Sequence, residues 1–334
     1  MKFLLNRIAA SVPTLLGVTL LAFFMIRWIP GDPITVMLGD RGGDPEMIAE
    51  LKSIYGLDRP LISQYFQFLG NLLRMDLGKS ILSHNAVLDE FTARFPATVE
   101  LGLVALVWSS ALGIILGVLA AVFRRSFLDY SLMGVSLVGY SMPIFWWGLL
   151  LILFFSVLLG WLPVSGRMSV MYDIPEKTGF LLIDSLFSEE RWPAFWDAVK
   201  HLTLPALALG TIPLAAIARM TRSSLLEVLK EDYIRTAKAK GLGVKSLIFK
   251  HALKNALTPI ITVIGLMLGA LLTGAILTET IFSWPGIGRW IVQAVNARDY
   301  PVIQGGVLLV SLTIILVNIL VDSLYFWVNP TLRK

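Results

Sequence analysis

The sequence predicts an all-α integral membrane protein with six transmembrane helices, and three observations support this fold class. The first is composition: 56% of the 334 residues are hydrophobic and only 15% are charged, whereas a typical soluble domain carries roughly 25% charged residues. The second is a series of long uncharged stretches, and the third is the side of the membrane on which the basic residues would fall. This composition excludes a soluble enzyme, a disordered protein and a nucleic-acid binder, even though the net charge is +5.

The uncharged stretches define the spans, because a helix needs about 20 mostly apolar residues to cross roughly 30 Å of hydrocarbon. The third stretch has room for one long span and an exit segment, and the fourth is short and contains Pro205 and Pro213. Prolines are tolerated in spans where neighbouring helices satisfy the freed backbone groups. The six predicted spans lie within residues 8–26, 101–123, 130–166, 202–218, 257–278 and 301–321.

The N-terminal stretch has two interpretations. Lys2 and Arg7 form a basic start that would also suit a secretory signal peptide. Its apolar run is longer than the usual 7–15 residues of a signal sequence, and no small-x-small cleavage site follows it. We therefore interpret it as an uncleaved first transmembrane helix, residues 1–29.

Charge placement predicts the orientation. If the N-terminus is cytoplasmic, the inside segments hold 15 basic and four acidic residues, and the outside segments hold 12 basic and 16 acidic residues. Because basic residues are enriched on the cytoplasmic side, both termini are predicted to be cytoplasmic, with the basic surplus facing the anionic inner leaflet of the lipid bilayer.

Residues 30–96 then form an outer segment with helices near 49–54 and 61–73. They are followed by a core, residues 97–327, that contains a basic cytoplasmic loop at 219–257. The outer segment is predicted to be a small periplasmic subdomain, the alternative being a passive cap over the spans.

Details within the spans give further expectations. Gly113 and Gly117 are four residues apart, a spacing that lets two helix backbones approach closely. Glu279 lies near the end of the fifth span, where interfacial solvation is the expected environment of a carboxylate.

There is no cysteine, and the three histidines are far apart in sequence, so no metal site is predicted. The segment from Gly241 to Ser246 lacks the glycine spacing and the Gly-Lys-Ser/Thr end of a phosphate-binding loop, so no catalytic residue is predicted.

The cytoplasmic loop contains a short helix with clear ends. Asp232 suits the N-cap, Gly241 suits the position after the C-cap, and lysines occupy the last turn. Eight residues span about 12 Å, and so short a helix is marginal in water. We therefore expect a partner surface to hold it, with Tyr233 as an anchor and Ala237 allowing close approach. A connector that lies on lipid headgroups is the alternative.

Seven stretches spread over essentially the whole chain form a distinctive set. They are IPGDP (29–33), FPATVEL (95–101), GYSMPIFWW (139–147), EDYIRTAKAKG (231–241), HALKNA (251–256), TETIFSWPG (278–286) and DYPVIQGG (299–306). With these stretches the chain resembles the membrane subunits of binding-protein-dependent ABC importers, in particular the dipeptide and oligopeptide permeases. The general loop motif of these subunits is matched here only at Ala237, Gly241 and Leu253, and its departures are those of that subfamily.

The resemblance implies a type I importer subunit, a multi-pass protein of the bacterial inner membrane. The implied partners are a second homologous permease, two ATPase subunits that bind ATP and Mg, and a periplasmic peptide-binding protein. This chain would need no cofactor of its own. The short loop helix becomes the coupling helix, and its predicted ATPase-docking residues are Asp232, Tyr233, Arg235, Thr236, Ala237 and Gly241.

Polar and aromatic residues inside the spans are candidates for the transport pathway, although such side chains also pack or bond between helices. The candidates are Tyr140, Ser141, Met142, Trp146 and Asn318.

Three alternatives stay open. A related importer of the same subfamily would carry nickel, glutathione or another small solute, although no histidine cluster favours nickel. A secondary transporter would work without an ATPase and would carry charged residues at mid-span together with inverted repeats. A structural membrane scaffold would transport nothing.

Overall fold

The computed structural model describes residues 2–28, 44–54 and 58–328. Every extended regular element in these residues is a helix, and the β-type pairing there is the isolated bridge between Lys79 and Ala86. The predicted all-α class is therefore confirmed for the described part of the chain.

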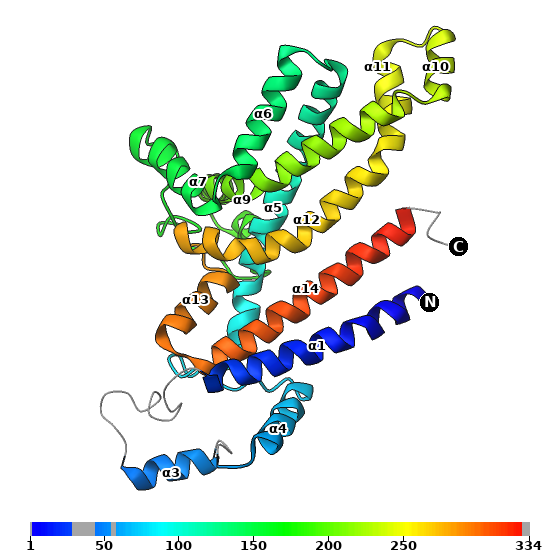
Figure 1. Ribbon diagram of the computed structural model, residues 1–334. Helices are drawn as coiled ribbons and strands as arrows, with labels where there is room; N and C mark the ends of the chain where they lie inside the picture. The colour runs from blue at the N-terminus through cyan, green and yellow to red at the C-terminus, as the bar shows by residue number, and fades with distance from the viewer. Residues whose placement is uncertain (1, 29–43, 55–57, 329–334) are drawn as a thin grey trace. The chain divides into compact units, whose positions relative to one another are not determined.

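Figure 1 shows the helices, which follow the predicted order of spans and connecting segments. In chain order they are α1 (Lys2–Trp28), α3 (Pro45–Ile54), α4 (Leu61–Leu73), α5 (Val87–Val122), α6 (Phe127–Ser141), α7 (Ile144–Leu151), the π-helical η2 (Ile152–Leu158), α8 (Leu181–Asp184), the 3₁₀ turn η3 (Ser185–Phe187), α9 (Arg191–Val228), α10 (Asp232–Ala239), α11 (Val244–Ser246), the π-helical η4 (Leu247–Ala252), α12 (Leu253–Ile281), α13 (Ile287–Ala297) and α14 (Tyr300–Val328).

Four helical segments of the described part are long and apolar enough to cross a membrane: α5, α9, residues 244–271, and the part of α14 from Tyr300 to Ser323. The pair formed by α6 and α7–η2 is a fifth if it counts as one span. The first predicted stretch lies on α1, whose apolar part, Ala9–Phe24, is shorter. Helices α3 and α4 cover the two helical regions expected in the outer segment.

The third predicted span is not continuous. Helices α6 and α7–η2 meet at an angle of 107°. Met142 has an extended backbone (φ −79°, ψ 132°), and Pro143 forms the cap of α7. A residue before proline disfavours the helical region, and proline has no N–H to continue the helix. The single long span expected here is therefore replaced by two helices joined at Met142–Pro143.

The chain forms two compact units, each with its own packing. The first unit contains residues 1–95 and 289–319. In it, the Thr19 hydroxyl of α1 bonds the Tyr65 hydroxyl of α4 at 2.9 Å, and the Phe23 ring packs edge-on against Tyr65. Asp299, just before α14, accepts hydrogen bonds from the Ser80 hydroxyl (2.6 Å) and the Ile81 N–H (3.1 Å).

The second unit, residues 96–288 and 320–334, is built around α9, which packs against α6, α7 and α12. Gly117 of α5 lies against α9 so closely that an added Cβ would be 2.5 Å from Cβ of Thr221 and 2.6 Å from the Ala218 carbonyl oxygen. At Gly113 the same atom would meet Ile217 at 3.0 Å. The predicted close approach at these glycines is confirmed, and the partner helix is α9.

The segment before α9 is organised by the buried carboxylate of Asp184, which is 2% exposed. It accepts hydrogen bonds from the Thr178 hydroxyl (2.7 Å) and from the N–H groups of Lys177, Thr178 and Gly179. Burial acts to raise the pKa of Asp184, but these hydrogen bonds outweigh it and hold the pKa below its ordinary value.

Replacing Gly117 by Leu should destabilise the second unit, because overpacking a tight contact costs about 1–3 kcal/mol or more. Thermal unfolding of the purified protein in detergent should show a lower midpoint. Gly134→Leu is the matched control, since an added Cβ there meets nothing within 4 Å. Equal midpoints for the two variants would contradict the close contact between α5 and α9.

Asp184→Asn should loosen residues 177–184 at neutral pH, because a hydrogen bond to a charged group contributes about 1.5–3 kcal/mol. A lowered pKa in the folded state means that the carboxylate stabilises the fold above the ordinary aspartate value. This contribution is lost as the pH falls through the lower folded value. Hydrogen exchange of this segment should therefore be faster in the variant at pH 7, and the difference from wild type should vanish only in acid, below about pH 4. The exposed Asp173 supplies the control, since Asp173→Asn should change nothing at either pH.

Candidate functional site

The loop between α9 and α12 contains the predicted short helix, α10, with its ends close to the expected positions. Glu231 is the N-cap (φ −64°, ψ 146°), and it makes no side-chain capping bond. The expectation that Asp232 is the N-cap is therefore wrong by one residue. Asp232 is the first helical residue, where its negative charge still suits the helix dipole, and it pairs with Arg235 at 3.3 Å on the surface.

The C-terminal end of α10 is confirmed. Gly241 has φ +82°, in the left-handed region that glycine adopts without steric cost. Its N–H bonds the Lys238 carbonyl (3.0 Å), and the Leu242 N–H bonds the Ala237 carbonyl (3.3 Å). This pair of bonds is the Schellman arrangement that ends many helices.

Two residues that the sequence did not single out attach α10 to the rest of its unit. Ile234 is 3% exposed and belongs to an apolar cluster with residues of α5, α9, η4 and α12. The Asn255 side-chain N–H donates to the Tyr233 hydroxyl at 2.6 Å, which joins α10 to the start of α12. Figure 1 shows α10 and α11 together beside the ends of α9 and α12. An i, i+3 or i+4 apolar pattern cannot be recognised in a helix with a single buried apolar position, so sequence periodicity gave no signal for Ile234.

The outer face of α10 is open to solvent. Asp232, Arg235 and Thr236 are exposed, and Tyr233 is 41% exposed. Ala237 is half-buried because it packs against the same apolar cluster as Ile234. Gly241 is exposed, with open space where a Cβ would lie. Five of the six predicted docking residues are therefore available to another protein, and Ala237 is partly used within this chain.

Four of the five pathway candidates gather at the break between α6 and α7. Tyr140 (47% exposed) and Ser141 end α6, Met142 forms the break, and Trp146 (45% exposed) lies in the first turn of α7. The Ser141 hydroxyl donates to the Leu137 carbonyl, within its own helix. Asn318 is exposed on α14 and belongs to the other unit.

Helix α9 touches both sides of this break. The indole N–H of Trp147, in α7, donates to the Thr211 hydroxyl at 3.0 Å. A Cβ on Gly139, in α6, would lie 2.8 Å from the Thr211 methyl group. The guanidinium carbon of Arg219 lies 4.6 Å from the centre of the Tyr140 ring, a cation–π contact.

Two of the stretches that carry the resemblance meet in the second unit, around the carboxylate of Glu279. The environment predicted for this carboxylate is wrong. Glu279 was expected at a solvated interface, but it is fully buried. The Thr98 hydroxyl donates to it at 2.6 Å, and the glycine backbone at Gly286 approaches it so closely that no side chain fits there. The Trp284 indole N–H donates to the Ala97 carbonyl at 2.9 Å. Partners far apart in sequence, which periodicity cannot reveal, explain the burial.

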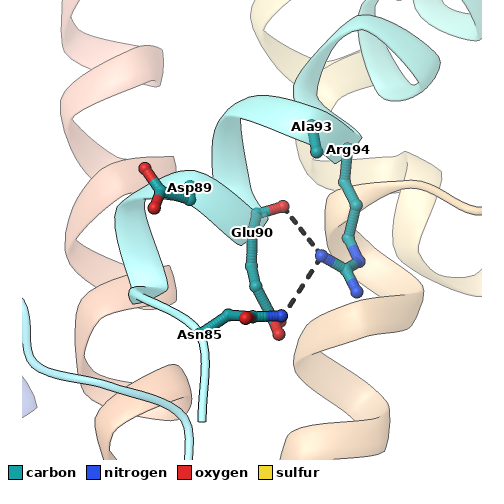
Figure 2. Close-up of a pocket in the computed structure, with 5 residues that line it drawn as sticks. All are labelled: Asn85, Asp89, Glu90, Ala93 and Arg94. Atoms are coloured by element: carbon teal, nitrogen blue, oxygen red, sulfur yellow. Dashed lines mark hydrogen bonds and ion pairs between the residues drawn. The ribbon is translucent and has the colours of Figure 1, made fainter. Parts of the chain in front are cut away.

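A shallow pocket in the first unit lies at the start of α5 (Figure 2). Arg94 bonds the Glu90 backbone carbonyl (2.9 Å) and pairs with its carboxylate (3.4 Å), and the Trp290 indole N–H donates to the same carboxylate. These charges are satisfied by the chain itself, and none of the predicted site residues is present. The described residues also contain no group of three or more His, Cys, Asp or Glu side chains that could hold a metal ion.

Comparison with known proteins gives consistent matches over the whole length. Residues 113–334 match the model of the binding-protein-dependent transport system inner membrane component, and residues 1–102 match the model of its N-terminal region. The chain is 56% identical over 333 residues to the di/tripeptide transport system permease protein DppB of Pseudomonas aeruginosa, covering 100% of this chain and 99% of the relative.

Two further relatives extend the comparison. The dipeptide transport system permease protein DppB of Escherichia coli K12 is 54% identical over 336 residues, with the same coverage. The glutathione transport system permease protein GsiC of Escherichia coli O6:H1 is 38% identical over 333 residues, also with the same coverage. The expected resemblance is confirmed: this chain is a membrane permease and belongs to the family of binding-protein-dependent transport system inner membrane components.

Proposed function

We propose that this chain carries dipeptides or other short peptides across the bacterial inner membrane, as a permease subunit of an ABC importer. Relatives named for di- and tripeptide transport are 54–56% identical to it over its full length. The relative named for glutathione, itself a small peptide, is 38% identical. A glutathione-like substrate is therefore the second candidate, and both candidates are short peptides.

The anchored loop helix α10 is the observation that best supports an ATP-driven mechanism. Its outer face presents polar side chains to solvent, and its inner face is fixed to the bundle by Ile234 and by the bond between Tyr233 and Asn255. A short helix fastened in this way moves with the helices behind it. A partner ATPase that binds the outer face would therefore displace α9 and α12 as it closes, which is a rigid-body switch.

The proposed assembly follows from the family. It contains a second permease, two ATPase subunits that bind ATP and Mg, and a peptide-binding protein on the periplasmic side. In this proposal the chain crosses the membrane six times with both termini in the cytoplasm. The α6–α7–η2 pair counts as one broken span, and residues 30–96 face the binding protein. ATP hydrolysis takes place in the partner subunits, so this chain is a permease and not an enzyme.

Bulky substitutions on α10 should test the docking surface. Ala237→Trp and Gly241→Trp should each abolish dipeptide uptake and the ATPase stimulation caused by the loaded binding protein. The ring at Gly241 blocks close approach of the ATPase, and the ring at Ala237 also displaces α10 from the apolar cluster against which Ala237 packs. The measurements are uptake and ATP hydrolysis by the complete importer in proteoliposomes. Because Gly241 has a positive φ, any side chain there also strains the end of the helix, at about 1 kcal/mol.

Gly243→Trp is the matched control. Gly243 also has open space around it, but its φ of −63° accepts any side chain, and it lies outside α10. The control should keep normal uptake. Normal uptake and ATPase stimulation in Ala237→Trp and Gly241→Trp, at normal expression, would refute the docking role. Uptake by this chain with no ATPase present would instead support a secondary transporter.

A further inference from the structure

Arg219 is an exposed arginine on a membrane-spanning helix, and no ion pair within the described residues neutralises it. Its guanidinium lies against the ring of Tyr140, 4.6 Å from the ring centre. Arg222, one turn further along α9, is different: its Nε and Nη2 bind both carboxylate oxygens of the buried Asp129 at 2.6 and 2.7 Å. Arg222 is therefore structural, and the charge of Arg219 is available to bind an anion.

The guanidinium of Arg219 extends away from the loop that carries α10. Asp129, in the first turn of α6, is level with Arg222, and Tyr140 lies 11 residues further along α6, about 16 Å away. Arg219 lies only three residues from Arg222, about 4.5 Å along α9. To meet the Tyr140 ring it must reach along α9 in the N-terminal direction, toward Thr211 in the middle of that helix, which contacts Gly139.

This direction is opposite to snorkelling. A basic residue near the cytoplasmic end of a span usually extends toward the lipid headgroups on that side. In the orientation proposed above, Arg219 instead extends from the cytoplasmic end of α9 toward the interior of the span. A charge at that depth needs water or an ionic partner. The exposed residue whose ring it contacts, Tyr140, is one of the pathway candidates at the break of α6 and α7.

We propose that Arg219, supported by the face of Tyr140, forms a site in the transport pathway that binds the C-terminal carboxylate of a short peptide in transit. The guanidinium carbon lies over the ring, and no hydrogen bond within the described residues uses the guanidinium N–H groups as donors. These donors match the two oxygens of a carboxylate. Exposure to water keeps such binding weak, which suits a ligand that must leave again. This inference rests on the proposed function, because it assumes that short peptides pass through this chain.

The test uses the absence of cysteine from the chain in a complete importer whose partner subunits have no reactive cysteine. Arg219→Cys should lower dipeptide uptake about tenfold, as expected when one charge-assisted contact is lost. Stimulation of the ATPase by the loaded binding protein should stay normal. Treatment with a cationic aminoethyl methanethiosulfonate should restore much of the uptake, and the anionic sulfonatoethyl reagent should not. Arg124→Cys, which removes an exposed cation from the turn between α5 and α6, should behave like wild type throughout.

Each other outcome overturns the inference. Wild-type uptake in Arg219→Cys would show that the charge is not needed, and equal rescue by both reagents would show that only volume matters. Loss of ATPase stimulation together with uptake would assign Arg219 a structural role. These results leave the proposed function intact if the wild-type importer carries dipeptides. A wild-type importer that hydrolyses ATP with its loaded binding protein but carries no dipeptide would refute both.

Discussion

The burial of Ile234 is the interaction that holds the loop helix α10 against the rest of its unit. Helix α10 has eight residues, too few to be stable in water alone. It is nevertheless a defined helix, because Ile234 is buried in an apolar cluster that also contains residues of α5, α9, η4 and α12, and because Asn255 bonds Tyr233. Through this cluster, the contacts that stabilise α10 also connect it to the long helices α5, α9 and α12. The stability of α10 and its coupling to the helix bundle therefore have one physical cause. A partner that binds the outer face of α10 acts on the bundle behind it.

The break between α6 and α7 provides a second constraint, on the pathway side of the same unit. Pro143 ends the helical hydrogen bonding, and Thr211 of α9 contacts residues on both sides of the break. A movement of α9 must therefore affect Gly139 and Trp147 together. Since α10 follows α9 and is fastened to the same apolar cluster, one helix links the exposed loop to the residues that we place in the pathway.

Much of this arrangement could be predicted from local sequence. Apolar length located the candidate spans, and Gly241 located the end of α10, because a glycine with positive φ is a local requirement. The spacing of Gly113 and Gly117 indicated a close helix contact, although it could not identify α9 as the partner. These features depend on the residues themselves or on their near neighbours in the chain.

The features that the sequence could not give depend on distant partners. The position of Glu279 near the end of a span predicts a residue at the membrane interface. Its side chain is buried because Thr98 and Gly286 approach it from distant parts of the sequence. The position of Asp232 suggested an N-cap, but the extended residue is Glu231. Pro143 was visible in the sequence, yet prolines are common in spans that stay continuous, as Pro205 and Pro213 show within α9. Ile234 is the one buried residue of α10, and its importance comes from the cluster to which it belongs.

The distance between α10 and α9 during the ATP cycle shows whether the two helices move as one body. Spin labels on cysteines introduced at the exposed Lys238 and Ser223 would report it by pulsed electron paramagnetic resonance, in a complete importer that still hydrolyses ATP. If α10 is fastened to the bundle, the distribution of distances should be the same in the nucleotide-free and ATP-bound complexes. A shift of several ångströms between the two states would show that α10 moves independently of α9, and would contradict the attachment of α10 to the bundle.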